Sequence, residues 1–67
     1  MVRVGPKVRH FRVKNSMTQK DLAEKAGVKQ SYITKIEADA TIPSLNVLHD
    51  IARALGVKTK SLIDEIA

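Results

Sequence analysis

Residues 19–37, QKDLAEKAGVKQSYITKIE, form the stretch that most restricts how this chain can fold. The stretch contains two apolar patterns with helical spacing, and the segment between them is long enough only for a tight turn. Gly27 falls at this junction, where a residue with positive φ reverses the chain most easily. Ala23 fits the point of closest approach, because a side chain larger than methyl would push the two helices apart. The stretch therefore predicts two short helices that meet at a steep angle.

Local signals mark the ends of these two helices. Thr18 and Asp21 have the spacing of a capping box, so the first helix is predicted to begin directly after Thr18. The second helix is predicted to begin near Gln30, where the preceding Lys29 is a poor N-cap. Only the first of the two helices therefore carries a strong start signal.

Three further helices are predicted outside this stretch. The first begins at Gly5-Pro6, because proline is tolerated at the first helical position, and it ends at Asn15-Ser16. The second follows Ser44, a good N-cap, and ends at Gly56. The third has Thr59 as its cap and carries the remaining apolar side chains, Leu62, Ile63 and Ile66.

No segment alternates with period two, so strands are not expected. Residues 1–67 are therefore predicted to form one all-α domain, a compact five-helix bundle.

The composition argues against several classes of protein. The absence of cysteine excludes a disulfide framework, a zinc knuckle and a thiol nucleophile. The two histidines, His10 and His49, fall in different predicted helices, so neither a catalytic site nor a metal or cofactor site is expected. No apolar run approaches the roughly 20 residues of a membrane span, and the chain is too short for a roomy ligand pocket. We expect a cytoplasmic protein that is not an enzyme.

The net charge of +5 is unevenly distributed along the chain. Residues 1–35 carry nine Lys or Arg and two acidic residues, a balance of +7. Residues 36–67 carry three basic and five acidic residues, a balance of −2. One basic end suggests a polyanionic partner, although a basic solvated surface is the alternative.

Two helices joined by a tight turn in this way form a helix-turn-helix, whose second helix lies in the major groove of DNA. The chain also resembles the Cro/C1-type helix-turn-helix family, which includes the DNA-binding domains of phage repressors. The resemblance runs from about Val8 to Ile63 and is carried by TQKDLAEKAGV, ITKIE, Pro43-Ser44-Leu45 and IARALGV. It implies a lambda-repressor-like DNA-binding domain with its helix-turn-helix at about residues 19–38.

The resemblance also implies which side chains meet DNA. In the family, DNA meets the first residue of the helix that begins after Thr18 here and the first exposed turn of the helix that begins near Gln30. The matching residues in this chain are Gln19, Gln30, Ser31 and Lys35. The amide of Gln30 suits the N6/N7 edge of adenine, Lys35 suits the acceptors of guanine, and Ser31 can contact either base. Thr34 is expected at the rim of the same face. For each residue, a solvated helix position is the alternative.

A second group of residues is expected to contact phosphates. Gln19 is placed for this role at a helix start, where backbone N–H groups attract anions. Tyr32 either leans on the DNA or covers the edge of the core. The remaining candidates are Thr18, Lys29, Arg9, Thr41 and Ser44. Val2 and Arg3 are expected to form a short mobile arm.

The resemblance further implies an ion pair between Arg12 and Glu37 that sets the angle of the helix predicted to begin near Gln30. The alternative is that Arg12 is solvated. The chain departs from the family at Asp39, which stands where glycine is usual, and in the uncharged loop at residues 40–42. Asp tolerates positive φ better than most residues, but its carboxylate would repel a phosphate. Loop contacts are then left to backbone N–H groups and to Thr41 or Ser44.

These features predict a sequence-specific regulator that binds double-stranded DNA, a repressor acting as a homodimer on a palindromic operator. The candidate dimer contacts are Leu62, Ile63 and Ile66. The alternative is an antitoxin-like or other protein-interaction module whose DNA binding is secondary. A helical bundle without a nucleic-acid role is the third possibility.

Overall fold

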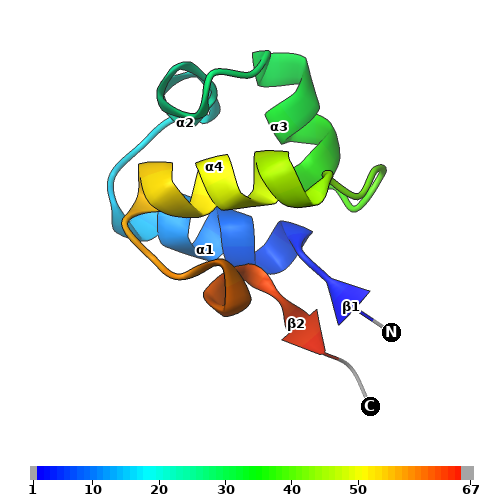
Figure 1. The fold of residues 1–67 in the computed structure, drawn as a ribbon. Helices are drawn as coiled ribbons and strands as arrows, with labels where there is room; N and C mark the ends of the chain where they lie inside the picture. Colours follow the sequence, from blue (N-terminus) through cyan, green and yellow to red (C-terminus); the bar gives the residue numbers. More distant parts are fainter. Residues whose placement is uncertain (1, 66–67) are drawn as a thin grey trace.

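The computed structural model describes residues 2–65 of the chain. In chain order its elements are β1 (Val2–Arg3), α1 (Gly5–Lys14), α2 (Gln19–Ala26), α3 (Gln30–Glu37), α4 (Leu45–Leu55), a 3₁₀-helix (Thr59–Leu62) and β2 (Asp64–Glu65). Figure 1 shows α4 across the centre of the molecule, with α2 and α3 above it. α4 packs against α1, α2 and the 3₁₀-helix, while α3 packs against α1 and α2.

One apolar core lies between these elements. Its fully buried side chains come from all four α-helices and from the 3₁₀-helix: Val8, Leu22, Ile33, Ile36, Ile51 and Leu62. Helices of 8 to 11 residues are too short to be stable alone in water, so burial of their apolar faces holds them together. The core therefore determines which face of each helix is left for solvent or a partner.

The ends of α2 agree with the predicted signals. The Thr18 hydroxyl accepts a hydrogen bond from the Asp21 backbone N–H at 3.0 Å, and the Asp21 carboxylate accepts one from the Thr18 backbone N–H at 2.9 Å. These two bonds form a complete capping box. Gly27 ends the helix at φ 73°, and α3 begins after Lys29 without a side-chain cap. The predictions for this turn are confirmed.

The predicted five-helix bundle is wrong, because residues 2–65 contain four α-helices. Thr59 is the first residue of a single 3₁₀ turn rather than the cap of a fifth helix, and Ile63 already has extended dihedral angles. Leu62 is fully buried whereas Ile63 is 41% exposed, so only one of these two neighbouring apolar side chains belongs to the core. A single helical turn is not stable by itself. Instead of continuing as a helix, the chain enters β2, which pairs with β1. Ile66 lies outside the described residues.

The expectations of no strands and of a free N-terminal arm are also wrong. β1 pairs with β2 in an antiparallel ladder, with Val2 opposite Glu65 and Arg3 opposite Asp64. The two strands lie side by side at the lower right of Figure 1. Strands of two residues are too short to show alternation in the sequence, so the periodicity argument could not detect them.

An ion pair links α1 to the end of α3. Arg12 Nε lies 2.7 Å from Glu37 Oε2, and Arg12 Nη2 lies 3.1 Å from Glu37 Oε1. The same guanidinium donates to the Met17 carbonyl at 2.8 Å. The side chains of Arg12 and Glu37 are 14% and 5% exposed, so water screens this pair little. The pair thus joins α1, the residues before α2 and the end of α3 at one point.

The capping box makes part of the stability depend on pH. The pKa of Asp21 is lowered, chiefly because its carboxylate accepts the Thr18 backbone N–H and secondarily through the Thr18 side chain. This stabilisation is present at pH values above the unfolded-state pKa and is lost as the pH falls through the folded-state pKa. Urea unfolding of wild type and Asp21→Asn across the acidic range should give a flatter pH dependence for the variant. Identical curves would contradict this assignment.

Removing one partner of the Arg12–Glu37 pair should destabilise the domain. Glu37→Gln leaves the Arg12 charge uncompensated in a poorly solvated position, and we expect a loss of about 1–3 kcal/mol in the free energy of unfolding. Glu24→Gln is the matched control, because Glu24 is exposed on α2, and its effect should stay within about 0.5 kcal/mol. Urea denaturation measures both, and equal midpoints for the two variants would contradict the expectation.

Candidate nucleic-acid interface

The outward face of α3 is exposed because the core takes the opposite face. Ile33 and Ile36 are fully buried, and since a helix has 3.6 residues per turn, the positions between them point away from the core. The exposed side chains of this face are Gln30, Ser31, Thr34 and Lys35. The fold thus brings the four predicted base-contacting residues onto one surface.

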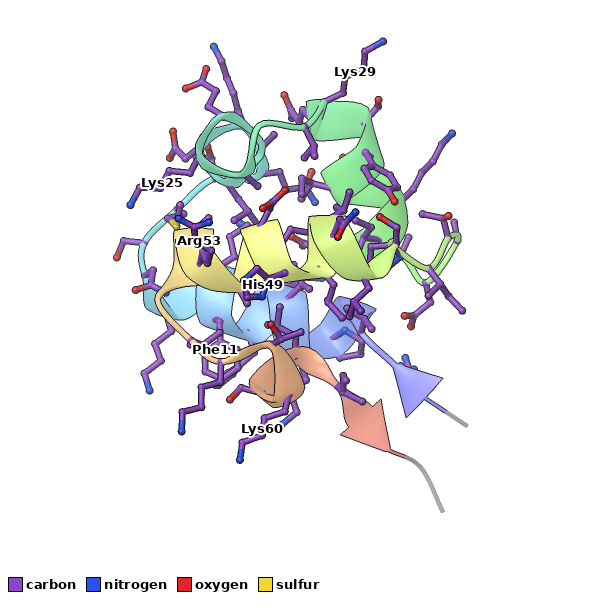
Figure 2. The ribbon with its side chains drawn as sticks, viewed as in Figure 1. Phe11, Lys25, Lys29, His49, Arg53 and Lys60 are labelled. Carbon is purple, nitrogen blue, oxygen red and sulfur yellow. The ribbon has the colours of Figure 1, made fainter. Side chains whose placement is uncertain are left out.

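Lys29 stands at the free end of this surface. It precedes the first residue of α3 and is exposed. Figure 2 shows its side chain at the top of the molecule, pointing away from the body of the protein. The α3 face and Lys29 can therefore meet a partner without any part of the described chain in between.

Gln19 and Thr34 are bonded to each other rather than free. The Thr34 hydroxyl donates to Gln19 Oε1 at 2.8 Å, and Gln19 Nε2 donates to Glu37 Oε1 at 3.4 Å. The ion pair continues this connection to Arg12. A polar chain thus runs from α1 through Glu37 and Gln19 to the rim of the α3 face. Sequence reasoning missed the Gln19–Thr34 bond, because contacts between two helices depend on their crossing angle.

An open hollow of about 280 Å³ lies beside this polar chain. Its lining comes from α1, α2, α3 and the residue after α3: Arg9, Arg12, Gln19, Thr34, Glu37 and Ala38. Arg9 is exposed and carries a positive charge, whereas the charges of Arg12 and Glu37 balance each other. The hollow therefore combines one exposed cation with the amide of Gln19, which is a suitable arrangement for an anion.

Thr18 and Ser44 both cap helices. Each hydroxyl accepts a backbone N–H of its helix, Thr18 from Asp21 and Ser44 from Val47, the latter at 3.3 Å. A hydroxyl that accepts in this way retains its own proton for an outside acceptor. Thr41 is half-buried in the loop before α4. Tyr32 is also half-buried and packs against the core, so its ring covers the core edge in the free protein.

Asp39 is tied to the N-terminus. It has φ 57°, and its carboxylate accepts from Arg3 Nε at 3.1 Å, from Arg3 Nη2 at 2.8 Å and from the Gly5 backbone N–H at 3.3 Å. A Cβ on Gly5 would lie 2.5 Å from the Ile36 carbonyl oxygen, so only glycine allows this close approach. Arg3 therefore offsets the negative charge that Asp39 places beside α3.

Residues 2–65 contain no group of three or more His, Cys, Asp or Glu side chains arranged to hold a metal ion. Within the same residues, every helix is too short or too polar to cross a membrane.

Comparison with known proteins agrees with this geometry. The sequence pattern of the helix-turn-helix family matches residues 8–62. The chain is 39% identical over 62 residues to the immunity repressor protein of Bacillus phage phi105, which covers 92% of this chain and 43% of that protein. It is 35% identical over 63 residues to the HTH-type transcriptional regulator SinR of Bacillus subtilis, covering 92% of this chain and 57% of SinR. The chain thus spans about half the length of these curated relatives.

Solved structures show the same fold. The N-terminal DNA-binding domain of SinR from Bacillus subtilis superposes with a TM-score of 0.86 at 33% identity, over 92% of this chain and 91% of that chain. The restriction-modification controller protein C.AhdI from Aeromonas hydrophila also gives a TM-score of 0.86, at 27% identity, over 88% of this chain and 89% of that chain. The chain therefore belongs to the helix-turn-helix family, and its resemblance to the Cro/C1-type members is confirmed.

Proposed function

We propose that this protein is a cytoplasmic, sequence-specific transcriptional regulator that binds double-stranded DNA and represses by occupying its site. The observation that carries the proposal is the α3 face, Gln30, Ser31, Thr34 and Lys35, which is exposed and polar and lies on the helix that ends at the Arg12–Glu37 pair. In the proposed complex, α3 lies in the major groove of the DNA. The protein has no enzymatic role in this proposal and needs no cofactor.

The α3 face supplies the chemistry for direct readout of bases. Gln30 pairs its amide with the N6/N7 edge of adenine, and Lys35 donates to O6 or N7 of guanine. Ser31 adds a short donor or acceptor between them. Among residues 3–63, whose side chains the structure describes, these three side chains make no hydrogen bond to the rest of the protein, so no such bond has to be broken before they contact a base.

Phosphate contacts surround this face. Arg9 and the Gln19 amide line the hollow beside α3. Lys29 precedes the first residue of α3, and its side chain points away from the protein (Figure 2). The capping hydroxyls of Thr18 and Ser44 donate their protons, with Thr41 and Tyr32 completing the set. The concentration of positive charge in residues 1–35 supports a polyanionic partner on this side.

The relatives support both DNA binding and repression. The phage phi105 relative is an immunity repressor protein, and SinR has been solved in complex with DNA, with a TM-score of 0.84 at 33% identity to this chain. Both are longer than this chain, which corresponds to the part of SinR described as its N-terminal DNA-binding domain.

A homodimer on a palindromic operator completes the proposal. A dimer presents two α3 faces about 34 Å apart, one for each half-site. Leu62 contributes nothing to a dimer contact because its side chain lies in the core, whereas Ile63 is 41% exposed and available. The symmetry of the selected DNA tests this part separately from DNA binding itself.

Selection from a random pool of duplex DNA at about 0.15 M salt should enrich one sequence motif, since base contacts discriminate where phosphate contacts do not. Gln30→Ala should relax the preference at one position of each half-site, with a loss of about 1–3 kcal/mol there. Sequencing the retained DNA measures both results.

Asn46→Ala is the matched control, because Asn46 carries an exposed carboxamide on α4 and should leave the motif unchanged. A two-fold motif supports the homodimer, and a single half-site contradicts it. Retention without enrichment, lost at higher salt, would contradict sequence reading and favour the protein-interaction module.

Arg9→Ala should weaken binding to all sequences alike. Removing one phosphate contact should reduce the slope of log affinity against log salt concentration by about 0.9. Lys60→Ala is the control, because Figure 2 shows Lys60 at the opposite end of the molecule from Lys29. Fluorescence anisotropy titrations at several salt concentrations measure the slopes, and equal slopes for the two variants would remove Arg9 from the interface.

A further inference from the structure

We infer that Thr34 is a positioning residue, whose hydroxyl orients the Gln19 amide so that an N–H of Gln19 faces a DNA phosphate. The inference rests on the proposed function for the phosphate itself, but its structural part concerns the free protein. In this inference Thr34 does not contact a base, and its hydroxyl acts on DNA binding through Gln19. Three features carry it: the partners of the Gln19 amide, the direction of the hydrogen bonds, and the restricted side chain of Thr34.

The neighbours of Gln19 leave its amide one orientation. Glu37 Oε1 is a carboxylate oxygen, which can only accept, so the amide nitrogen must face it. Arg12 balances the charge of this carboxylate with two hydrogen bonds and keeps it in place. The amide oxygen then faces Thr34, whose hydroxyl is 2.8 Å away and can donate. The orientation follows from the chemistry of both partners.

Thr34 is well suited to hold this oxygen. In a helix the threonine hydroxyl reaches the carbonyl four residues earlier, and Thr34 Oγ1 lies 3.2 Å from the Gln30 carbonyl oxygen. Its single proton has two possible acceptors, and the shorter contact is to Gln19. The branched side chain thus stays in the rotamer that reaches Gln19, and its proton is not available to a base acceptor.

The consequence for binding is a donor that is oriented before DNA arrives. One amide proton of Gln19 points to Glu37, and the second is left for the hollow, which Arg9 also lines. A phosphate oxygen accepts from both an amide N–H and a guanidinium. Without the Thr34 hydroxyl, the amide of Gln19 is held only by its 3.4 Å bond to Glu37, so the direction of its second N–H is less well defined and it binds a phosphate more weakly.

Thr34→Val tests the inference, because valine keeps the branched shape of threonine but has no hydroxyl. We expect about threefold to tenfold weaker binding to every DNA sequence alike, while Thr34→Ser, which keeps the hydroxyl, stays near the wild-type affinity. Thr59→Val is the matched control, since Thr59 lies in the 3₁₀-helix, away from the α3 face. Anisotropy titrations and urea midpoints of all variants separate binding from stability.

A double-mutant cycle distinguishes positioning from a direct contact. If Thr34 acts through Gln19, Thr34→Val should add nothing to Gln19→Ala. Additive losses, a changed base preference in Thr34→Val, or unchanged affinity would each overturn the inference.

The free protein gives a readout that does not require DNA. The side-chain NH₂ signals of Gln19 in NMR spectra should shift and lose order in Thr34→Val but not in Thr34→Ser. Unchanged signals in Thr34→Val would overturn the inference. If wild type retained no duplex DNA while these signals behaved as expected, the proposed function would fail and the positioning of Gln19 would stand.

Discussion

The Arg12–Glu37 pair joins α1, the end of α3 and the residues before α2 at one partly buried point. Apolar burial brings α1, α2 and α3 together, and the interdigitation of their side chains contributes to the angles at which they cross. Hydrogen bonds from one guanidinium to Glu37 and to the Met17 carbonyl are directional, and they lie where water is largely excluded. Gln19 and Thr34 extend the same set of bonds to the surface. One mostly buried charge pair is therefore connected by hydrogen bonds to the rim of the polar α3 face.

The end of α3 is also held from the side of the N-terminus. Asp39, at positive φ, binds Arg3 and the Gly5 backbone, and the strand pair β1–β2 keeps Arg3 in reach. In a domain this small, one core leaves the termini with few contacts, and these polar bonds supply some of the missing ones. Asp39 would have been a poor neighbour for DNA if its charge were free. Its pairing with Arg3 makes the departure from the usual glycine compatible with the proposed interface.

Local signals predicted the helix-turn-helix well because its chemistry is contained in few neighbouring residues. Thr18 and Asp21 satisfy each other within one turn, and Gly27 takes its positive φ whatever packs around it. The C-terminal segment was predicted poorly, because Leu62 and Ile63 are equally apolar and only the core's remaining space decides which one is buried. The strand pair escaped prediction for a similar reason: residues 2–3 and 64–65 meet only after the helices have brought both ends together.

The sequence by itself determined four of the five predicted helices, the turn at Gly27, the buried face of α3 and hence its exposed row of polar residues, since these follow from apolar spacing and local end signals along one stretch of chain. Only the tertiary structure decided how those polar residues are used. Gln19 and Thr34 are fifteen positions apart, and their bond exists because α2 and α3 cross at one particular angle. Side-chain hydrogen bonds tolerate errors of only a few tenths of an ångström, and the spacing of residues in a sequence does not define distances between helices that closely.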